Sequence, residues 1–348
     1  MSNIYFKHHS AGLINQTMSA EIAFSLAFLQ EAKLCIYNTK QTQEDPILMP
    51  TNLMSIIPPE RRKLYIGSSQ PTVFDLLNIP NNISYILDHN KNIDEKYIKD
   101  IPNYKNLLSY YYRCGESGLD EKSFADGRSR LVFDLENDVH LYHYTFPLYS
   151  SFFYNRPKSL DTFLSELCFK EPYQILAKKI VKHIGPFNGF HFRLTDHAKN
   201  YDYLKITLNC VMESFNCKDI PLIISSDDKE MVKNLFKHKC IFIDEIIQKK
   251  FGDDFMRLPF HNEIVFGMIS LLVMGYSQEF IGTPGSTFSS YIHRLRIIKG
   301  STQKINHLPF GRLKNSNDLG RPYSWNNYDL SVSEKSWYRE WPECKLQV

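Results

Sequence analysis

Short apolar runs alternate with longer helical patterns along much of the chain, which predicts an α/β protein. The opening residues predict a strand at Ile4–Lys7, a loop at His8–Asn15, a helix at Thr17–Glu31 and a second strand at Leu34–Tyr37. Strand, tight loop, helix and strand in this order are typical of the start of a doubly wound α/β domain.

The stretch up to residue 185 gives weaker signals. Residues 38–112 are rich in Asn, Pro and Lys and predict loops and short helices, and strands are expected at Arg130–Phe133 and His140–Tyr144. Ser159–His183 is a long helical pattern with a break expected at Pro172, because proline interrupts a helix. We interpret this helix as a linker and the first helix of a second domain.

Strands and helices alternate regularly from residue 189 onward. The pattern predicts strands at 189–193, 221–225, 240–244 and 279–282, and helices at 201–215, 229–238, 262–274 and 287–298. Such alternation implies a parallel sheet with helices on its faces. The tail from Pro309 to Val348 is rich in Trp, Tyr and Pro and is expected to pack back on the body as an irregular segment.

The chain length favours two domains. It has 348 residues, and single hydrophobic cores stop growing near about 250–300 residues. We therefore predict a first domain at 1–158, a second at 159–307 and a tail at 308–348. Two doubly wound domains that face each other form a cleft, where a ligand lies outside the carboxyl ends of the strands.

Composition excludes several classes of protein. The 41 Lys and Arg against 38 Asp and Glu give a net charge of +3, which excludes a generally basic nucleic-acid wrapper. The seven cysteines are odd in number and form no C-x-x-C pair, which argues against a zinc ribbon and a disulfide framework.

Apolar runs in the chain are short. The N-terminus lacks a basic segment followed by an apolar run, so no secretory signal is expected. The most apolar stretch, Ile264–Met274, is far shorter than the roughly 20 residues of a transmembrane helix. We therefore expect a cytoplasmic protein without a transmembrane segment.

The strongest candidate for chemistry is the segment His191–Asp196, which lies where the predicted strand at 189–193 ends and a helix is expected to begin. An arginine at a strand's carboxyl end, next to a helix N-terminus, suits a phosphate, because its guanidinium group and the helix N–H groups bind phosphate oxygens. Asp196 would hold Arg193 or the loop in place. The alternative is an Arg193–Asp196 surface pair that caps a helix.

Two more motifs follow predicted strands of the same sheet. After the strand at 221–225, Asp227 and Asp228 would accept hydrogen bonds from a guanine edge or a ribose hydroxyl, or would only cap the next helix. After the strand at 279–282, the segment Gly282–Ser290 offers backbone N–H groups and hydroxyls to a pyrophosphate, or is an ordinary loop before a capped helix. Three motifs at carboxyl ends of one parallel sheet favour a nucleotide pocket.

The first loop of the chain carries a fourth candidate. In the predicted loop after Ile4–Lys7, Gly12 permits a tight turn, Asn15 offers its amide to a ligand, and His9 is a candidate base. A loop with ordinary polar residues is the alternative. The paired carboxylates in Gly252–Asp254 are interpreted as a solvated turn, and no metal site is predicted.

Taken together, these motifs resemble the GDP-fucose fucosyltransferases of the GT-B type, a group that contains α-1,2-, α-1,6-, nodulation and protein O-fucosyltransferases. The resemblance covers residues 189–296 well and the first 40 residues loosely. The residues that carry it are Gly12, Asn15, His191, Arg193, Thr195, Asp196, Ser226, Asp227, Asp228, Ser286, Thr287, Phe288, Ser289, Ser290 and Arg294.

The resemblance implies two Rossmann-like domains facing across a cleft and an inverting, metal-independent transfer of fucose to a glycan or glycoconjugate. By it, Arg193 would bind the β-phosphate, Asp227 or Asp228 would bind guanine, and no cofactor is needed. Where the α-1,6 branch has a lysine and a glutamate that serve proton removal, this chain has His197 and Tyr201. The resemblance therefore assigns neither the base nor α-1,6 specificity.

The expected site residues divide into two groups. The catalytic group is His9, Arg193 and Asp196. The donor-binding group is Gly12, Asn15, His191, Arg193, Asp227, Asp228, Ser286, Thr287, Phe288, Ser289 and Ser290. A GT-B transferase of another nucleotide sugar, and a catalytically silent protein that binds a glycan or a partner, are the alternatives.

Overall fold

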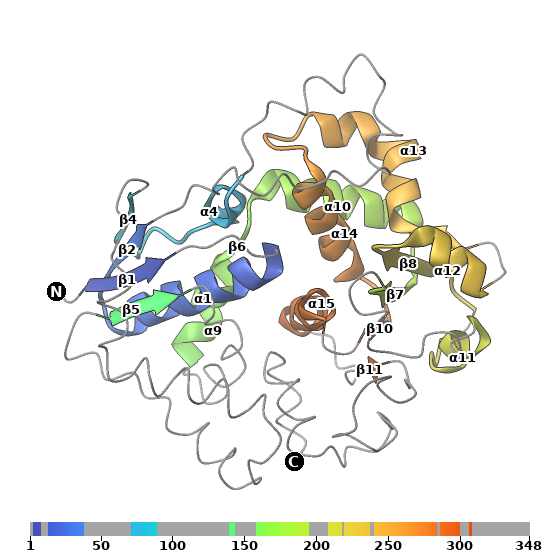
Figure 1. Ribbon diagram of the computed structural model, residues 1–348, viewed down its shortest axis with the longest axis horizontal. Helices are drawn as coiled ribbons and strands as arrows, with labels where there is room; N and C mark the ends of the chain where they lie inside the picture. The colour runs from blue at the N-terminus through green and yellow to red at the C-terminus, as the bar shows by residue number, and fades with distance from the viewer. Residues whose placement is uncertain are drawn as a thin grey trace, which may run out of the picture. The chain divides into compact units, whose positions relative to one another are not determined.

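The structure is a computed structural model, shown in Figure 1, with helices and parallel sheets. It describes residues 3–7, 13–37, 71–88, 139–142, 158–194, 208–217, 219–236, 240–283, 286–299 and 306–307. The chain divides into two compact units, and the main boundary between them along the chain falls between Glu171 and Pro172. Asn262–Ile264 also belongs to the first unit.

The first unit contains a four-stranded sheet in the order β4-β2-β1-β5. Its strands are β1 (Asn3–Lys7), β2 (Lys33–Tyr37), β4 (Tyr85–Asp88) and β5 (Val139–Tyr142). All three pairings are parallel. Both predicted opening strands are confirmed, and β5 coincides with most of the strand expected at His140–Tyr144.

Helix α1 (Leu13–Leu29) follows β1 and is buried on nearly every side. It begins at Leu13 rather than at Thr17, so Asn15 lies in the opening turn of the helix and not in a loop. The start escaped prediction because a helix that is buried all round has no polar face to mark its period. Phe28 of α1 stacks on Phe163 of α9 (Lys158–Glu166) with ring centroids 4.7 Å apart.

Three short strands of the first unit, β4 among them, were not predicted. Helix α4 (Val73–Leu76) leads into β3 (Leu77–Asn78), which pairs antiparallel with β6 (Cys168–Phe169). Because β6 lies between α9 and α10 (Glu171–Ile184), the long helix expected at Ser159–His183 is two helices. The break comes before Pro172, which lies in the first turn of α10, where a proline is tolerated.

The second unit contains a five-stranded sheet in the order β11-β10-β7-β8-β9. Its strands are β7 (Asn188–Phe192), β8 (Leu222–Ser226), β9 (Ile241–Phe242), β10 (Phe280–Gly282) and β11 (Asn306–His307). Every pairing is parallel, as the alternation of strands and helices predicted. β11 was not predicted.

Helices of the second unit follow the predicted order with one addition. They are α10, α11 (Leu208–Glu213), α12 (Lys229–Phe236), α13 (Ile243–Met256), α14 (Glu263–Met274) and α15 (Thr287–Ile298). In the part of the chain that the structure describes, none of the helices has the length and apolar character needed to cross a membrane.

Helix α13 corrects the sequence interpretation twice. The strand expected at Cys240–Asp244 has only two residues, and Asp244 is already in the first turn of α13. Gly252–Asp254 lies inside this helix and is not a turn, because apolar residues four apart, such as Ile247 and Phe251, bury one face of it. Asp254 pairs with Lys179 of α10 at 2.6 Å.

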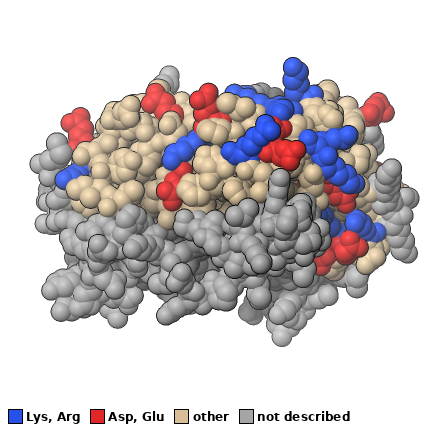
Figure 2. All heavy atoms as spheres, turned by 90° about the horizontal axis from the view of Figure 1, so that it is seen from above, with Lys and Arg blue, Asp and Glu red and all other residues tan. Residues whose placement is uncertain are grey.

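Figure 2 shows that basic and acidic side chains are interspersed over one face of the molecule.

Strand β7 lies in the middle of the second sheet, and all five of its residues are buried. Phe190 and Phe192 lie on one face of the sheet, where both rings stack on Phe236 of α12 at 6.1 Å. Burying one such ring stabilises the fold by roughly 1.5–3 kcal/mol. Because side chains alternate along a strand, His191 lies on the opposite face, where it meets α15.

Candidate functional site

The order of strands in the second sheet identifies where a ligand is expected. Counting β7 as the first strand, the order reads 5-4-1-2-3, and it reverses between β7 and β10. In doubly wound sheets, ligands bind outside the carboxyl ends of the strands at this reversal. The described residues of the motif His191–Asp196 lie at the end of β7, and those of the motif Gly282–Ser290 lie at the end of β10 and the start of α15. The structure therefore brings two of the predicted motifs to the expected position.

The carboxyl end of β7 is fixed to β10 by Thr283. The Arg193 backbone N–H donates to Thr283 Oγ1 at 2.9 Å, and the Thr283 hydroxyl donates to the His191 carbonyl oxygen at 2.8 Å. Thr283 is fully buried, whereas Arg193 is half-buried. One hydroxyl thus continues the hydrogen bonding of the sheet beyond the last paired residues of β7 and β10.

Ser289 holds the start of α15 against both strands. Its Oγ accepts the Thr283 backbone N–H at 2.9 Å and lies 2.7 Å from His191 Nδ1. The Phe288 ring packs on the His191 imidazole with centroids 4.6 Å apart. At Gly282 an added Cβ would lie 2.6 Å from Ser289 Cβ, so only glycine permits this close approach of helix and strand.

The β8 side of β7 is fixed by two more side chains. Ser226 donates its hydroxyl to the Phe192 carbonyl oxygen at 2.7 Å, and Asp227 Oδ1 accepts the Leu194 N–H at 2.7 Å. Asp228 Oδ1 accepts the Met231 N–H at 2.9 Å and so caps α12. Its other carboxylate oxygen has no partner among the described residues. Asp228 therefore caps a helix and still has an acceptor to offer.

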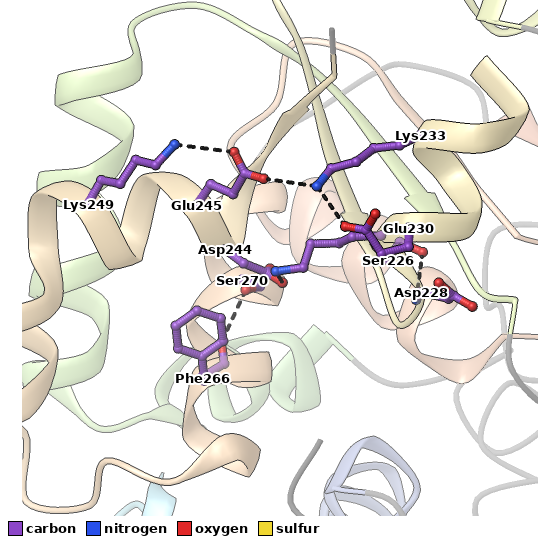
Figure 3. Close-up of polar contacts among 10 residues, drawn as sticks. Ser226, Asp228, Glu230, Lys233, Asp244, Glu245, Lys249, Phe266 and Ser270 are labelled. Atoms are coloured by element: carbon purple, nitrogen blue, oxygen red, sulfur yellow. Dashed lines mark hydrogen bonds and ion pairs between the residues drawn. The ribbon is translucent and has the colours of Figure 1, made fainter. Parts of the chain in front are cut away.

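Helix α12, which starts directly after Asp228, is anchored to α13 by charged pairs (Figure 3). Lys229 Nζ lies 3.3 Å from Asp244 Oδ2, and both side chains are mostly buried. Burial raises the pKa of Asp244, although the Lys229 ammonium opposes the rise. Lys233 lies 2.8 Å from Glu230 and 3.8 Å from Glu245, nearer the surface. These pairs hold in place the helix that carries the Asp227–Asp228 loop.

Most of the predicted second-unit residues therefore come together at one edge of one sheet. The residues placed at the carboxyl ends of β7, β8 and β10 or in the first turn of α15 are His191, Arg193, Asp227, Asp228, Ser286, Thr287, Phe288, Ser289 and Ser290. Asn15 belongs to the first unit. The predictions for His9, Gly12 and Asp196 fall outside the described residues.

Several of these side chains serve the structure of the site. Ser286 and Ser289 are buried, and the Ser289 hydroxyl bonds inside the protein. Arg294 is buried as well, and its Nη1 donates to Tyr291 Oη at 3.4 Å. The backbone N–H groups at the start of α15, with Thr287, are the better candidates to meet a phosphate.

Thr283 lies in the predicted loop Gly282–Ser290, but the sequence assigned it no role of its own. No local pattern reveals that its hydroxyl reaches residues 90 and 92 positions earlier in the chain. The sequence also assigned no role to Arg296. Its guanidinium donates to the carbonyl oxygens of Ser277 and Gln278, which precede β10. Burial lowers the pKa of Arg296 to about 10. In the described part of the chain, no three metal-ligating side chains gather.

No protein-family model matches the chain, and no curated protein sequence matches it. Among solved structures it is similar to the fucosyltransferase NodZ from Bradyrhizobium, with 12% identity and a TM-score of 0.45 over 84% of this chain and 93% of that chain. It is also similar to POFUT1 in complex with GDP-fucose, with 13% identity and a TM-score of 0.40 over 88% of this chain and 98% of that chain.

Proposed function

We propose that this protein is an inverting, metal-independent fucosyltransferase. It would move fucose from GDP-fucose to a hydroxyl of a glycan or glycoconjugate, with its two units arranged as the Rossmann-like domains of a GT-B enzyme. The observation that carries this proposal is the convergence of Arg193 and the start of α15 at the reversal of strand order in the second sheet, with Asp228 after the neighbouring strand β8. The sequence resemblance adds the identity of the donor.

The donor would lie across the carboxyl ends of β7, β8 and β10. The N–H groups at the start of α15 suit its pyrophosphate, because a helix N-terminus combines unpaired donors with a positive dipole end. Arg193 supplies a full positive charge next to them. At the neighbouring strand, the second oxygen of Asp228 and the exposed Asp227 carboxylate suit the two N–H donors of a guanine edge.

In the reaction, the acceptor hydroxyl oxygen attacks C1 of fucose as the bond from C1 to the phosphate oxygen breaks. GDP leaves with that electron pair, and a base, for which His9 is the candidate, takes the hydroxyl proton. Charge builds up on the β-phosphate in the transition state, so a fixed cation stabilises the transition state more than the bound donor. That is the role proposed for Arg193, and it requires no metal ion.

The test is release of GDP from GDP-fucose by the purified protein, measured with excess EDTA present, with and without a mixture of glycan acceptors. We expect GDP release in EDTA and inversion at C1 in any product. Activity that appears only with Mn²⁺ or Mg²⁺ would contradict the metal-independent mechanism. Release from UDP-sugars and not from GDP-fucose would favour another donor, and nucleotide release from none would favour a silent binding protein.

A further inference from the structure

Side chains extend the sheet past the end of β7, and they alternate between its two neighbours. The backbone groups of residues 191 and 193 bond to Thr283 on the β10 side, at 2.8 and 2.9 Å. Those of residues 192 and 194 bond to Ser226 and Asp227 on the β8 side, both at 2.7 Å. The backbone around Arg193 is therefore fixed by hydrogen bonds on both sides.

Thr283 contributes more to this arrangement than the other side chains. Its hydroxyl accepts one hydrogen bond and donates another, to two residues on either side of Phe192. Its own backbone N–H donates to Ser289 Oγ, which also lies 2.7 Å from the His191 ring. Thr283 is thus the residue that joins the backbone of Arg193 to the first turn of α15.

We propose that Thr283 is a positioning residue for Arg193, an inference that rests on the proposed function. Arg193 and the start of α15 would bind the same pyrophosphate, so their relative position decides how well both meet it. Thr283 fixes this relative position, because its hydroxyl bonds to the Arg193 backbone, its backbone N–H bonds to Ser289, and the residue is fully buried. It does not itself touch the donor.

A hydroxyl is required at this position, and a side chain of the same shape would not replace it. Valine fills the space of threonine but can neither accept the Arg193 N–H nor donate to the His191 carbonyl. Both groups would then be left without these bonds and the strand end would shift toward other partners. A displacement of about 1 Å near a reacting group can cost about a hundredfold in rate.

The experiment compares GDP release from GDP-fucose by Thr283→Val, Thr283→Ser and a matched control, Ser270→Ala. Ser270 donates its buried hydroxyl to the Phe266 carbonyl oxygen at 3.1 Å within α14, outside the site (Figure 3). We expect kcat/KM to fall roughly tenfold to a hundredfold in Thr283→Val. Thr283→Ser should restore most of the activity, because serine keeps the hydroxyl, and Ser270→Ala should match the wild type.

A second measurement separates positioning from a general structural role. Thr283→Val is combined with Arg193→Ala, and hydrogen exchange is followed by mass spectrometry in the peptide that spans residue 193. If Thr283 acts through Arg193, the double variant should be no slower than Arg193→Ala alone, since effects through one partner do not add. Exchange near residue 193 should be faster in Thr283→Val and unchanged in Ser270→Ala.

Two results would overturn the inference while the proposed function stands. One is an active wild type with unchanged kcat/KM in Thr283→Val. The other is a Thr283→Val defect of the same size with and without Arg193, because Thr283 would then act independently of it. A wild-type protein that neither binds GDP nor releases it from GDP-fucose would overturn the proposed function and, with it, the inference.

Discussion

Replacing Gly282 with alanine tests the close contact on which the geometry of the site depends. Gly282 is the last residue of β10, and Ser289 of α15 lies directly against it. An added Cβ would be 2.6 Å from Ser289 Cβ, 2.9 Å from Ser289 Oγ and 3.3 Å from Phe280 Cε1. Ordinary contacts between carbon atoms are about 3.5–4.0 Å long. The helix and the strand would therefore have to separate by about 1 Å.

The cost of this separation has two parts. Ser289 Cβ is attached directly to the backbone of α15, so it cannot swing aside as the end of a long side chain could. Overpacking of this kind typically costs about 1–3 kcal/mol. A 1 Å shift would also break the 2.9 Å hydrogen bond from Thr283 N to Ser289 Oγ, which costs about 1 kcal/mol. We expect Gly282→Ala to lower the free energy of unfolding by about 2–4 kcal/mol.

The assay is urea unfolding followed by circular dichroism, with the midpoint and the slope compared between variants. Gly267→Ala is the matched control, because an added Cβ at this position of α14 meets nothing within 4 Å. Alanine in a helix interior is better than glycine by about 0.5–1 kcal/mol, so this variant should be slightly more stable. A Gly282→Ala protein as stable as the wild type would refute the close contact between β10 and α15.

Three further predictions concern charge. Arg193→Lys and Arg193→Ala should both lower turnover about a hundredfold or more, because lysine keeps the charge but cannot form the two parallel hydrogen bonds of a guanidinium. Unchanged circular dichroism would show that folding survives. Normal turnover in Arg193→Ala would exclude the proposed role of Arg193. Lys229→Met should destabilise the protein by about 3 kcal/mol at pH 7, because it leaves the buried Asp244 unpaired. The decrease in the free energy of unfolding caused by Lys229→Met, measured with urea, should be smaller at pH 5, since burial raises the pKa of Asp244 and its neutral form needs no partner. Equal decreases at pH 5 and pH 7 would contradict this. Burial raises the pKa of Glu263 from 4.5 to about 7, so the folded protein favours the protonated side chain. The stability that this form contributes is fully present below pH 4.5 and is lost as the pH rises through 7. Glu263→Gln should therefore gain stability relative to the wild type at pH 8 and not at pH 5, whereas the exposed Glu213→Gln should show no such difference.

The second sheet could be predicted well because most of its strands are short apolar runs separated by recognisable helical patterns. β7, β8 and β10 and helices α12, α14 and α15 lie within a few residues of their predicted positions. The order of the strands could not be predicted, because it depends on pairings between residues far apart, such as Ile281 with Phe190. The expected meeting of motifs at one sheet edge followed from parallel strands alone.

Two helices that lack a simple polar and apolar stripe, α1 and α13, were predicted poorly, whereas α14, which is also buried on most sides, was predicted within one residue. Helix α13 combines an apolar face with Gly252 and paired acidic residues, and the last two features suggested a turn. Helix α1 is buried on nearly all sides, so its first turn, with Asn15, could not be distinguished from the preceding loop. In both cases, packing against other elements decides the structure.

The individual roles of site residues were the least predictable part. The sequence indicated that Asp227 and Asp228 either bind a ligand or cap a helix, and the structure shows that Asp228 caps α12 while Asp227 fixes the end of β7. Ser289 was expected to face phosphates, yet its hydroxyl is buried between Thr283 and His191. The contact between His191 and Ser289 joins residues 98 positions apart, and no local pattern reveals it.

The central claim, that the second unit binds the guanine nucleotide of a sugar donor, is tested most directly by calorimetric titration with GDP and with UDP. The wild type is compared with Asp228→Asn, which keeps the cap of α12 because asparagine caps helices as well as aspartate does, but loses the carboxylate. We expect the wild type to bind GDP at least roughly tenfold more tightly than UDP, an energy of about 1.4 kcal/mol, and Asp228→Asn to lose this preference. Equal affinities for GDP and UDP in the wild type would contradict the assignment of the donor.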